Sequence, residues 1–149
     1  MAHYNFNKDL VEGEEGEKFV IKYLEKYWGG KFLSDNKTNS HDVEIEFPSS
    51  TQIFEIKTDV YPKDTGNIFV EFESRGKDSG IVVTKADWFV TYFKHLKEIW
   101  FIETNKLREL INENNFYQTS KSGDEGSNTR GYLIRRKQYK DHFKVIKLK

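Results

Sequence analysis

The clearest pattern in the chain is the alternation of apolar and acidic residues over His41–Phe47. A period of two is typical of a strand with one buried face. After the turn residues Pro48–Thr51, the segment Ile53–Lys57 alternates again, with Glu55 and Lys57 on one face and apolar side chains on the other. The pattern predicts a β-hairpin.

A long helix is predicted over Asp9–Trp28, where apolar residues recur at helical spacing and Asp9 stands at the N-cap. Acidic residues crowd its first turns, where the helix dipole favours them, and two glycines follow its last residue. Gly13 and Gly16 lower helix propensity inside this segment. We expect them to permit a close approach of the helix to a sheet.

Shorter patterns place the remaining elements. Strands are predicted over 31–34, 67–74, 98–103, 131–136 and 143–148. Helices are predicted over 86–96, opened by Thr84, and over 105–114, capped by Thr104. Stretches 58–66 and 118–130 are predicted to be loops. This order predicts one domain over residues 1–149, of the α/β class, with a mixed β-sheet flanked by helices.

The amino-acid composition excludes several kinds of site and guides the expected location of the protein. The chain has 149 residues, no cysteine, and four histidines without zinc-site spacing, which excludes disulfides and thiolate metal sites. No run is long and apolar enough to span a membrane, and no charged-then-apolar leader opens the chain. We therefore expect a cytoplasmic protein with no membrane partner.

The formal net charge is zero, but the charge is unevenly distributed. Residues 130–149 contain eight Lys or Arg and one Asp, a net charge of +7, so residues 1–129 carry −7. A basic end on an acidic body suggests contact with a phosphate backbone there. A pair of solvated strands explains the same composition equally well.

The predicted hairpin carries the candidate chemistry. Folding it brings Asp42 opposite Glu55 or Lys57, with opposed Cβ atoms roughly 5 Å apart. Two carboxylates at this spacing can hold Mg²⁺, and a neighbouring lysine can orient an attacking water or stabilise a phosphate under attack. The alternative is an ordinary charged face of a hairpin turned to solvent.

A further carboxylate comes from the first helix. Glu17 lies three residues before Val20 and seven before Leu24, at the edge of the core-facing stripe. Glu14 lies about one turn earlier on nearly the same face, so either residue is a candidate. The alternative is that both are solvated acids of the first turns. Glu73, on the strand predicted over 67–74, is an accessory candidate.

The spacing Asp42-x12-Glu55-x-Lys57 resembles the signature of the PD-(D/E)xK nucleases, with His41 in place of the signature proline. The segment around Glu17 is similar to the first helix of the resolvase-type members. The resemblance covers about residues 9–114 and implies a restriction-endonuclease-like core. It implies that Asp42, Glu55, Glu17 and the backbone carbonyl of Ile56 hold Mg²⁺, for which Mn²⁺ can substitute. Lys57 would then position the attacking water.

The implied activity is hydrolysis of DNA phosphodiester bonds. The expected enzyme is a structure-selective nuclease similar to Holliday junction resolvases, acting as a homodimer on branched or duplex DNA, or a repair or recombination exonuclease. The Asn-, Lys- and Ile-rich composition hints at a phage or mobile element, which would place the protein in the host cytoplasm. Two alternatives stay open: a catalytically silent nuclease-fold module that binds DNA or protein, and a small domain with a fortuitous E-x-K triplet.

Six basic residues are predicted to contact the DNA backbone. Arg75, Lys77 and Lys85 stand beside the predicted N-terminus of the helix 86–96, where a helix dipole favours phosphate. Arg135, Arg136 and Lys137 are adjacent in the basic C-terminal segment, and on a strand they alternate between its faces.

Overall fold

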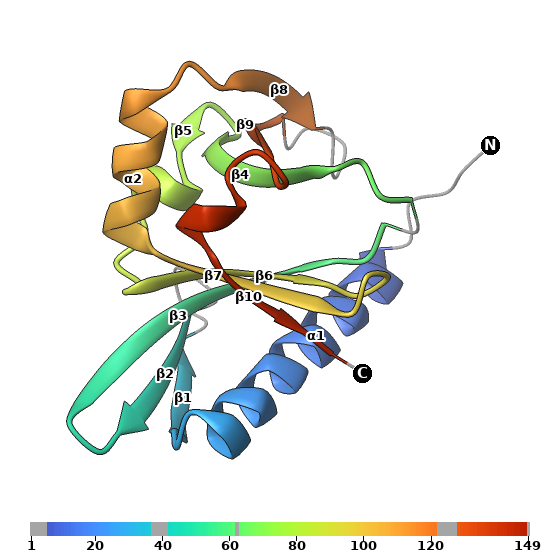
Figure 1. The fold of residues 1–149 in the computed structure, drawn as a ribbon. Helices are drawn as coiled ribbons and strands as arrows, with labels where there is room; N and C mark the ends of the chain where they lie inside the picture. Colours follow the sequence, from blue (N-terminus) through green and yellow to red (C-terminus); the bar gives the residue numbers. More distant parts are fainter. Residues whose placement is uncertain (1–5, 37–41, 62, 122–127, 149) are drawn as a thin grey trace.

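The structure, a computed structural model, describes residues 6–36, 42–61, 63–121 and 128–148 (Figure 1). Within this range, the side chains of 6–10, 34–36, Asp42 and Lys121 are also outside the description. The described residues form two helices, two short 3₁₀ turns and ten strands in two sheets. The fold is therefore mixed α/β, as predicted.

The larger sheet has six strands in the order β1-β2-β3-β6-β7-β10. Their bounds are Lys31–Asn36 (β1), Asp42–Phe47 (β2), Ser50–Asp59 (β3), Trp88–Phe93 (β6), Glu98–Glu103 (β7) and Lys144–Lys147 (β10). Strands β3 and β6 run parallel, and all other neighbours run antiparallel. The predicted mixed sheet is thus confirmed.

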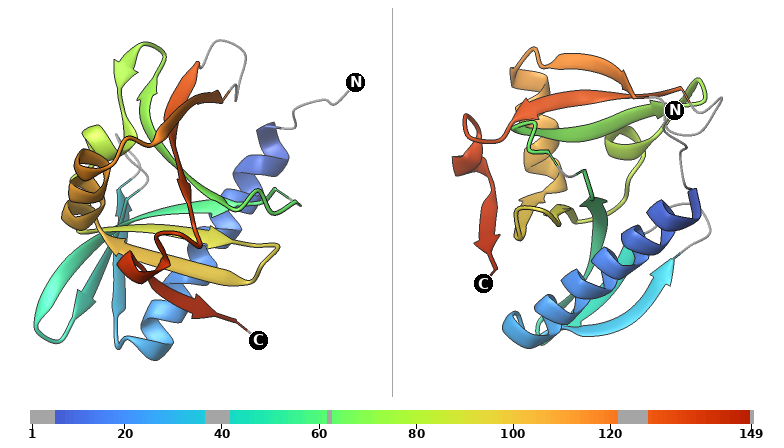
Figure 2. Two further views of the ribbon diagram at one scale, coloured as in Figure 1. Left: turned by 45° about the horizontal axis from the view of Figure 1, so that its top comes forward. Right: turned by 90° about the vertical axis from the view of Figure 1, so that its right-hand side faces the viewer.

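A second, four-stranded sheet has the order β5-β4-β9-β8 and was not expected from the sequence. Its strands are Asn67–Ser74 (β4), Lys77–Asp78 (β5), Tyr117–Lys121 (β8) and Thr129–Arg135 (β9). The helix α1 (Phe6–Tyr27) lies on one side of the six-stranded sheet, whereas the second sheet and α2 (Thr104–Glu113) lie on the other (Figures 1 and 2). The 3₁₀ turns are Gly80–Val82 (η1) and Lys140–His142 (η2).

Two apolar cores follow from this layering. On the α1 side, Val20 and Leu24 are completely buried against Val43 and Phe54 of the sheet. On the other side, side chains of β4, β9, η1 and α2 bury residues of β6 and β7 such as Phe89. The six-stranded sheet is thus buried on both faces at its centre. Close packing of both layers contributes most of the driving force for folding.

The prediction of a helix over 86–96 is wrong: this segment forms the strand β6 and the turn after it. Trp88, Val90 and Tyr92 contact the α1 core, while Phe89 and Phe93 contact the second core. A strand buried on both faces is apolar throughout, and such a run satisfies a helical period as well as a strand period. The capping role of Thr84 fails with it, because its Oγ1 accepts a hydrogen bond from the Ala86 N–H at 3.2 Å in a turn.

Several other boundaries differ in detail. Strand β3 continues to Asp59, so the predicted loop 58–66 is shorter than expected, and β8 occupies the start of the predicted loop 118–130, whose residues 122–127 lie outside the description. Thr104 is the first residue of α2 instead of a cap before it. The predicted first helix, the hairpin, β4, β7, α2, β9 and β10 are confirmed.

One expectation about α1 is confirmed for a single glycine. A Cβ atom added at Gly16 would meet the side chain of Thr58, whereas one added at Gly13 would meet no atom within 4 Å. Gly16 therefore permits the close contact between α1 and β3, and Gly13 does not take part in it. No helix among the described residues is long and apolar enough to cross a membrane.

Candidate functional site

The register of the hairpin decides which residue faces Asp42. Strands β2 and β3 pair antiparallel with Asp42 directly opposite Glu55 and Val43 opposite Phe54. Of the two partners predicted for Asp42, Glu55 is therefore confirmed. Lys57 lies two residues further along β3. The side chain of Asp42 is outside the described part, so the backbone register is what places this residue.

Glu55 is an unusual residue for its position. Its neighbours Phe54 and Ile56 point into the α1 core, so Glu55 lies on the opposite face of β3. Only 5% of its surface is exposed. A buried carboxylate costs several kcal/mol unless it is paired, hydrogen-bonded or bound to a metal. Its burial distinguishes Glu55 from the side chains of an ordinary solvated hairpin face.

Lys57 shares the face of Glu55 but reaches solvent. Its Cα partner on β6 is Thr91, and that of Glu55 is Phe89. The site is thus graded along β3, with a buried carboxylate followed by an exposed ammonium group. Such a gradient places the positive charge where an anionic ligand would arrive.

The described part of β2 ends beside these residues. Strand β2 begins at Asp42, opposite Glu55. In the described part of the chain, the β3 residues 56–59 pair with β6 alone. Along this stretch of β3 the described neighbour is therefore β6, whereas residues 37–41, which precede Asp42, lie outside the description.

Packing of the helix α1 places Glu17 beside the end of β3. Gly16 contacts Thr58, the residue after Lys57, so the backbone of Glu17 lies beside the end of β3. Glu17 is half-buried and Glu14 is exposed, which agrees with the choice of Glu17 as the first candidate. However, α1 covers the face of β3 opposite to Glu55 and Lys57, so the side chain of Glu17 starts from the other face of the sheet.

The described side chains contain no group of three or more Asp, Glu, His or Cys residues that could together hold one metal ion. This set excludes the Asp42 carboxylate, so the predicted ligand group of Asp42, Glu55 and Glu17 is not tested. The chemistry of the donors is suited to Mg²⁺, because carboxylates and the Ile56 carbonyl are hard oxygen ligands. Such donors also suit Mn²⁺.

The expectation that the strand of Glu73 lies beside that of Glu55 is wrong. Strand β4 belongs to the second sheet and is not a neighbour of β3. Glu73 instead forms an ion pair with Arg130 of β9, at 3.4 Å between Oε2 and Nη1. A surface pair of this kind contributes at most about 1 kcal/mol to stability.

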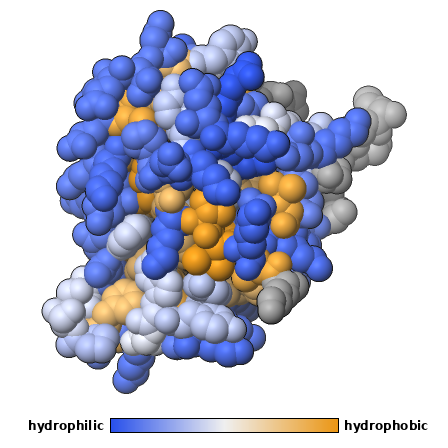
Figure 3. All heavy atoms as spheres, viewed as in Figure 1, coloured by the Kyte–Doolittle hydropathy of each residue, from blue (hydrophilic) through white to orange (hydrophobic). Residues whose placement is uncertain are grey.

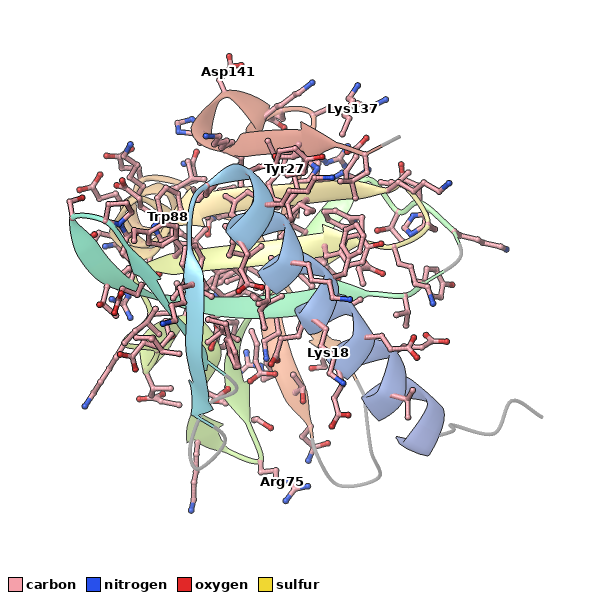
Figure 4. All side chains as sticks on the ribbon, turned by 90° about the horizontal axis from the view of Figure 1, so that it is seen from below. Lys18, Tyr27, Arg75, Trp88, Lys137 and Asp141 are labelled. Carbon is pink, nitrogen blue, oxygen red and sulfur yellow. The ribbon has the colours of Figure 1, made fainter. Side chains whose placement is uncertain are left out.

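The basic residues predicted to bind DNA do not form one surface. Arg75 and Lys77 are exposed at the turn between β4 and β5, and Lys85 is exposed before β6, but the helix N-terminus expected beside them does not exist. Arg75 and Lys137 lie at opposite ends of the molecule (Figure 4). The two predicted groups would therefore contact different parts of a substrate.

Arg136 is removed from the DNA-binding set because it is only 4% exposed. Its Nη2 lies 2.6 Å from Oδ1 of Asp64, and its guanidinium lies 4.6 Å from the centre of the Phe93 ring. The hydrogen bond from Arg136, aided by the Gly66 N–H, lowers the pKa of Asp64. Arg136 thus joins a loop to the second core, while Arg135 and Lys137 are exposed.

One surface feature was missed at the sequence level. A groove of about 640 Å³ lies between α1 and β10 and contains aromatic and lysine side chains. A signal for it exists in the sequence, since a Lys-aromatic pair recurs every four residues over 18–27. The prediction of the first helix uses only apolar residues of this segment and takes no account of the lysines beside them.

Comparison of the chain with models of known protein families, with curated proteins and with solved structures finds no match. The functional argument therefore depends on the residues themselves and on their placement in this fold.

Proposed function

We propose that this protein is a Mg²⁺-dependent nuclease with a restriction-endonuclease-like core that hydrolyses phosphodiester bonds in DNA. The observation that carries the proposal is the buried Glu55 directly opposite Asp42, with Lys57 exposed two residues further on the same face. The backbone of Glu17, next to Gly16 at the end of β3, adds support. The PD-(D/E)xK resemblance orders these residues in the same way.

In this proposal Asp42, Glu55 and the Ile56 carbonyl hold the cation, and Glu17 completes the set directly or through water. When bound, the cation supplies polarisation of the scissile phosphate and neutralises the negative charge that develops on it. The burial of Glu55 keeps this carboxylate in one orientation before substrate arrives.

Lys57 acts on the reacting water and phosphate. Its ammonium group donates hydrogen bonds that orient the water and stabilise charge on the non-bridging oxygens. The water oxygen forms a bond to phosphorus and releases a proton, the bond from phosphorus to one bridging oxygen breaks, and that oxygen takes up a proton. One product end therefore carries a phosphate and the other a hydroxyl group.

The preferred substrate class is branched DNA, as expected for a resolvase-like nuclease, with exonuclease action in repair or recombination as the neighbouring activity. Arg75, Lys77, Lys85, Arg135 and Lys137 are the exposed candidates for backbone contacts. Because they occupy separate regions, a branched or bent substrate would engage them better than a short straight duplex.

The decisive experiment is a cleavage assay on labelled linear duplex, four-way junction and single-stranded DNA, with and without Mg²⁺ or Mn²⁺. We expect metal-dependent cleavage of at least the junction substrate. Lys57→Ala should abolish cleavage while retaining DNA binding, and Glu55→Gln should also abolish metal-dependent activation. Lys140→Ala, which removes an exposed lysine of η2, is the matched control and should cleave like the wild type.

Two results would contradict the proposal. Cleavage by Lys57→Ala at the wild-type rate would remove this lysine from the mechanism. Binding of DNA without cleavage of any substrate, under either metal, would instead indicate a catalytically silent nuclease fold.

A further inference from the structure

The groove between α1 and β10 has a one-sided composition. In the described part of the chain, its lining contains three lysines, three aromatic residues and two aliphatic residues, and no acidic residue. They are Phe19, Lys22, Tyr23, Lys26, Tyr27, Ile146, Lys147 and Leu148. The protein as a whole has equal numbers of acidic and basic residues, so this local positive charge is a specific feature of the groove.

The helix side of the groove is built from a short repeat. Lysines 18, 22 and 26 are each followed by an aromatic residue, at positions 19, 23 and 27. Residues four apart lie almost above one another on a helix, so α1 presents a row of lysines beside a row of aromatic rings. With a rise of 1.5 Å per residue, successive members of each row are about 6 Å apart.

The aromatic row is held in place and partly open to solvent. Phe19 stacks on Tyr92 of β6, with ring centres 4.9 Å apart, and Tyr23 contacts Tyr27 at 4.8 Å. Phe19 is 39% exposed and Tyr27 is 62% exposed. Burial of Tyr23, with Tyr27 beside it, raises the pKa of its phenol, so the ring stays neutral at physiological pH.

The opposite wall is the edge strand β10. Hydrophobic surface around this strand is interrupted by hydrophilic side chains (Figure 3). Ile146 and Leu148 are half-buried in the groove, and Lys147 between them is exposed. The groove therefore offers flat apolar surfaces and positive charges side by side over its whole length.

This combination matches a polymer that alternates flat rings with negative charges. In a single-stranded nucleic acid the bases expose their faces, whereas in a duplex those faces are stacked and cannot reach aromatic side chains. A second copy of the chain on the same groove would bring the lysine row against an identical row, and like charges oppose such an interface.

We propose that the groove between α1 and β10 binds single-stranded nucleic acid, with bases stacked on Phe19 and Tyr27 and phosphates at Lys22, Lys26 and Lys147. This inference rests on the proposed function and extends it to DNA substrates that contain single strands.

The test is the fluorescence anisotropy of a labelled oligothymidylate of about 15 nucleotides, a length within the usual range of single-strand sites. EDTA is present throughout, so that cleavage does not interfere. Tyr27→Ala should weaken binding about tenfold at every salt concentration, because stacking carries no counterion release. The matched control is Tyr117→Ala, which removes a 71% exposed tyrosine on β8 and should leave the affinity unchanged.

The lysines are tested by the salt dependence of binding. Removing two phosphate contacts with Lys22→Ala and Lys26→Ala should flatten the log–log slope by about 1.4, at roughly 0.7 per contact on a single strand. Lys140→Ala serves again as the control. Phe19→Leu keeps an apolar side chain against Tyr92 while removing the flat ring, so a loss of affinity in a folded protein supports stacking.

Several outcomes would overturn the inference. They are an unchanged affinity in both aromatic variants, an unchanged salt slope in the lysine double variant, or equal losses on a duplex of the same length. Dissociation of a dimer by Tyr27→Ala, seen by sedimentation without a change in DNA affinity, would identify the groove as an interface between copies. Because all these variants keep Lys57, their metal-dependent cleavage activity tests the proposed function separately from this inference.

Discussion

The contact between α1 and β3 yields the sharpest prediction, because a single added methyl group tests it. In Gly16→Ala the new Cβ would lie 2.7 Å from Cγ2 and 2.8 Å from Cβ of Thr58, and closer still to Oγ1. Ordinary contacts between carbon atoms are about 3.5–4.0 Å. Thr58 is β-branched and stiff at χ1, so the overlap is relieved mainly by a shift of the helix.

The magnitude follows from comparison with Gly13→Ala. Both substitutions replace a helical glycine, and each gains about 1 kcal/mol of helix propensity. At Gly13 no atom lies within 4 Å of the new methyl group, so the gain should appear as increased stability. At Gly16 overpacking costs about 1–3 kcal/mol. The difference between the two variants should therefore be about 1–3 kcal/mol.

Urea denaturation and thermal melting of both variants measure this difference. For a chain of this size, 1 kcal/mol corresponds to about 2–4 °C in Tm. The double variant Gly16→Ala with Thr58→Gly removes the colliding atoms, so a double-mutant cycle should show a favourable coupling. If the proposed function holds, Gly16→Ala should also slow cleavage through displacement of Glu17. A Gly16→Ala protein as stable as Gly13→Ala would refute the close packing.

Three further predictions concern polar side chains. Asp64→Asn should lower the Tm at neutral pH, because Arg136 loses its charged partner. The pKa of Asp64 is lowered from the ordinary value of 3.8, so its contribution to stability is present above that value and is lost as the pH falls through the lowered pKa. The Tm difference between Asp64→Asn and the wild type should therefore narrow in acid. Glu17→Gln should weaken Mg²⁺ activation of cleavage more than Glu14→Gln does, and the reverse order in metal titrations would move the ligand one turn along α1. Arg108→Ala removes hydrogen bonds to the carbonyls of Ile81 and Thr84 and should cost about 1–3 kcal/mol in urea unfolding, while no loss would show that these bonds are replaced by water.

The candidate site depended on the sequence for its residues and on the fold for its arrangement. Local alternation and a turn were sufficient to predict the hairpin and the pairing of Asp42 with the second strand. The same pattern could not choose between Glu55 and Lys57 as the direct partner, because the register depends on the exact turn and on packing against α1. Nor could it place Glu73, because hydropathy does not show which strands share a sheet.

Other features were decided only by long-range packing. Arg136 carries a charge and lies in a basic segment, so its sequence context predicts a surface residue; only the meeting of Asp64, Phe93 and Trp100 around it accounts for its burial.

The sequence by itself determined where the chain forms α1, the β2–β3 hairpin and α2, because each shows a clear period of apolar and polar residues. The tertiary structure alone decided that 88–93 is a strand, since neighbours on both sides bury it and remove the contrast that a period needs. It also decided the pairing of β3 with β6 and the second sheet. These contacts join residues far apart in the chain, and local periodicity carries no information about them.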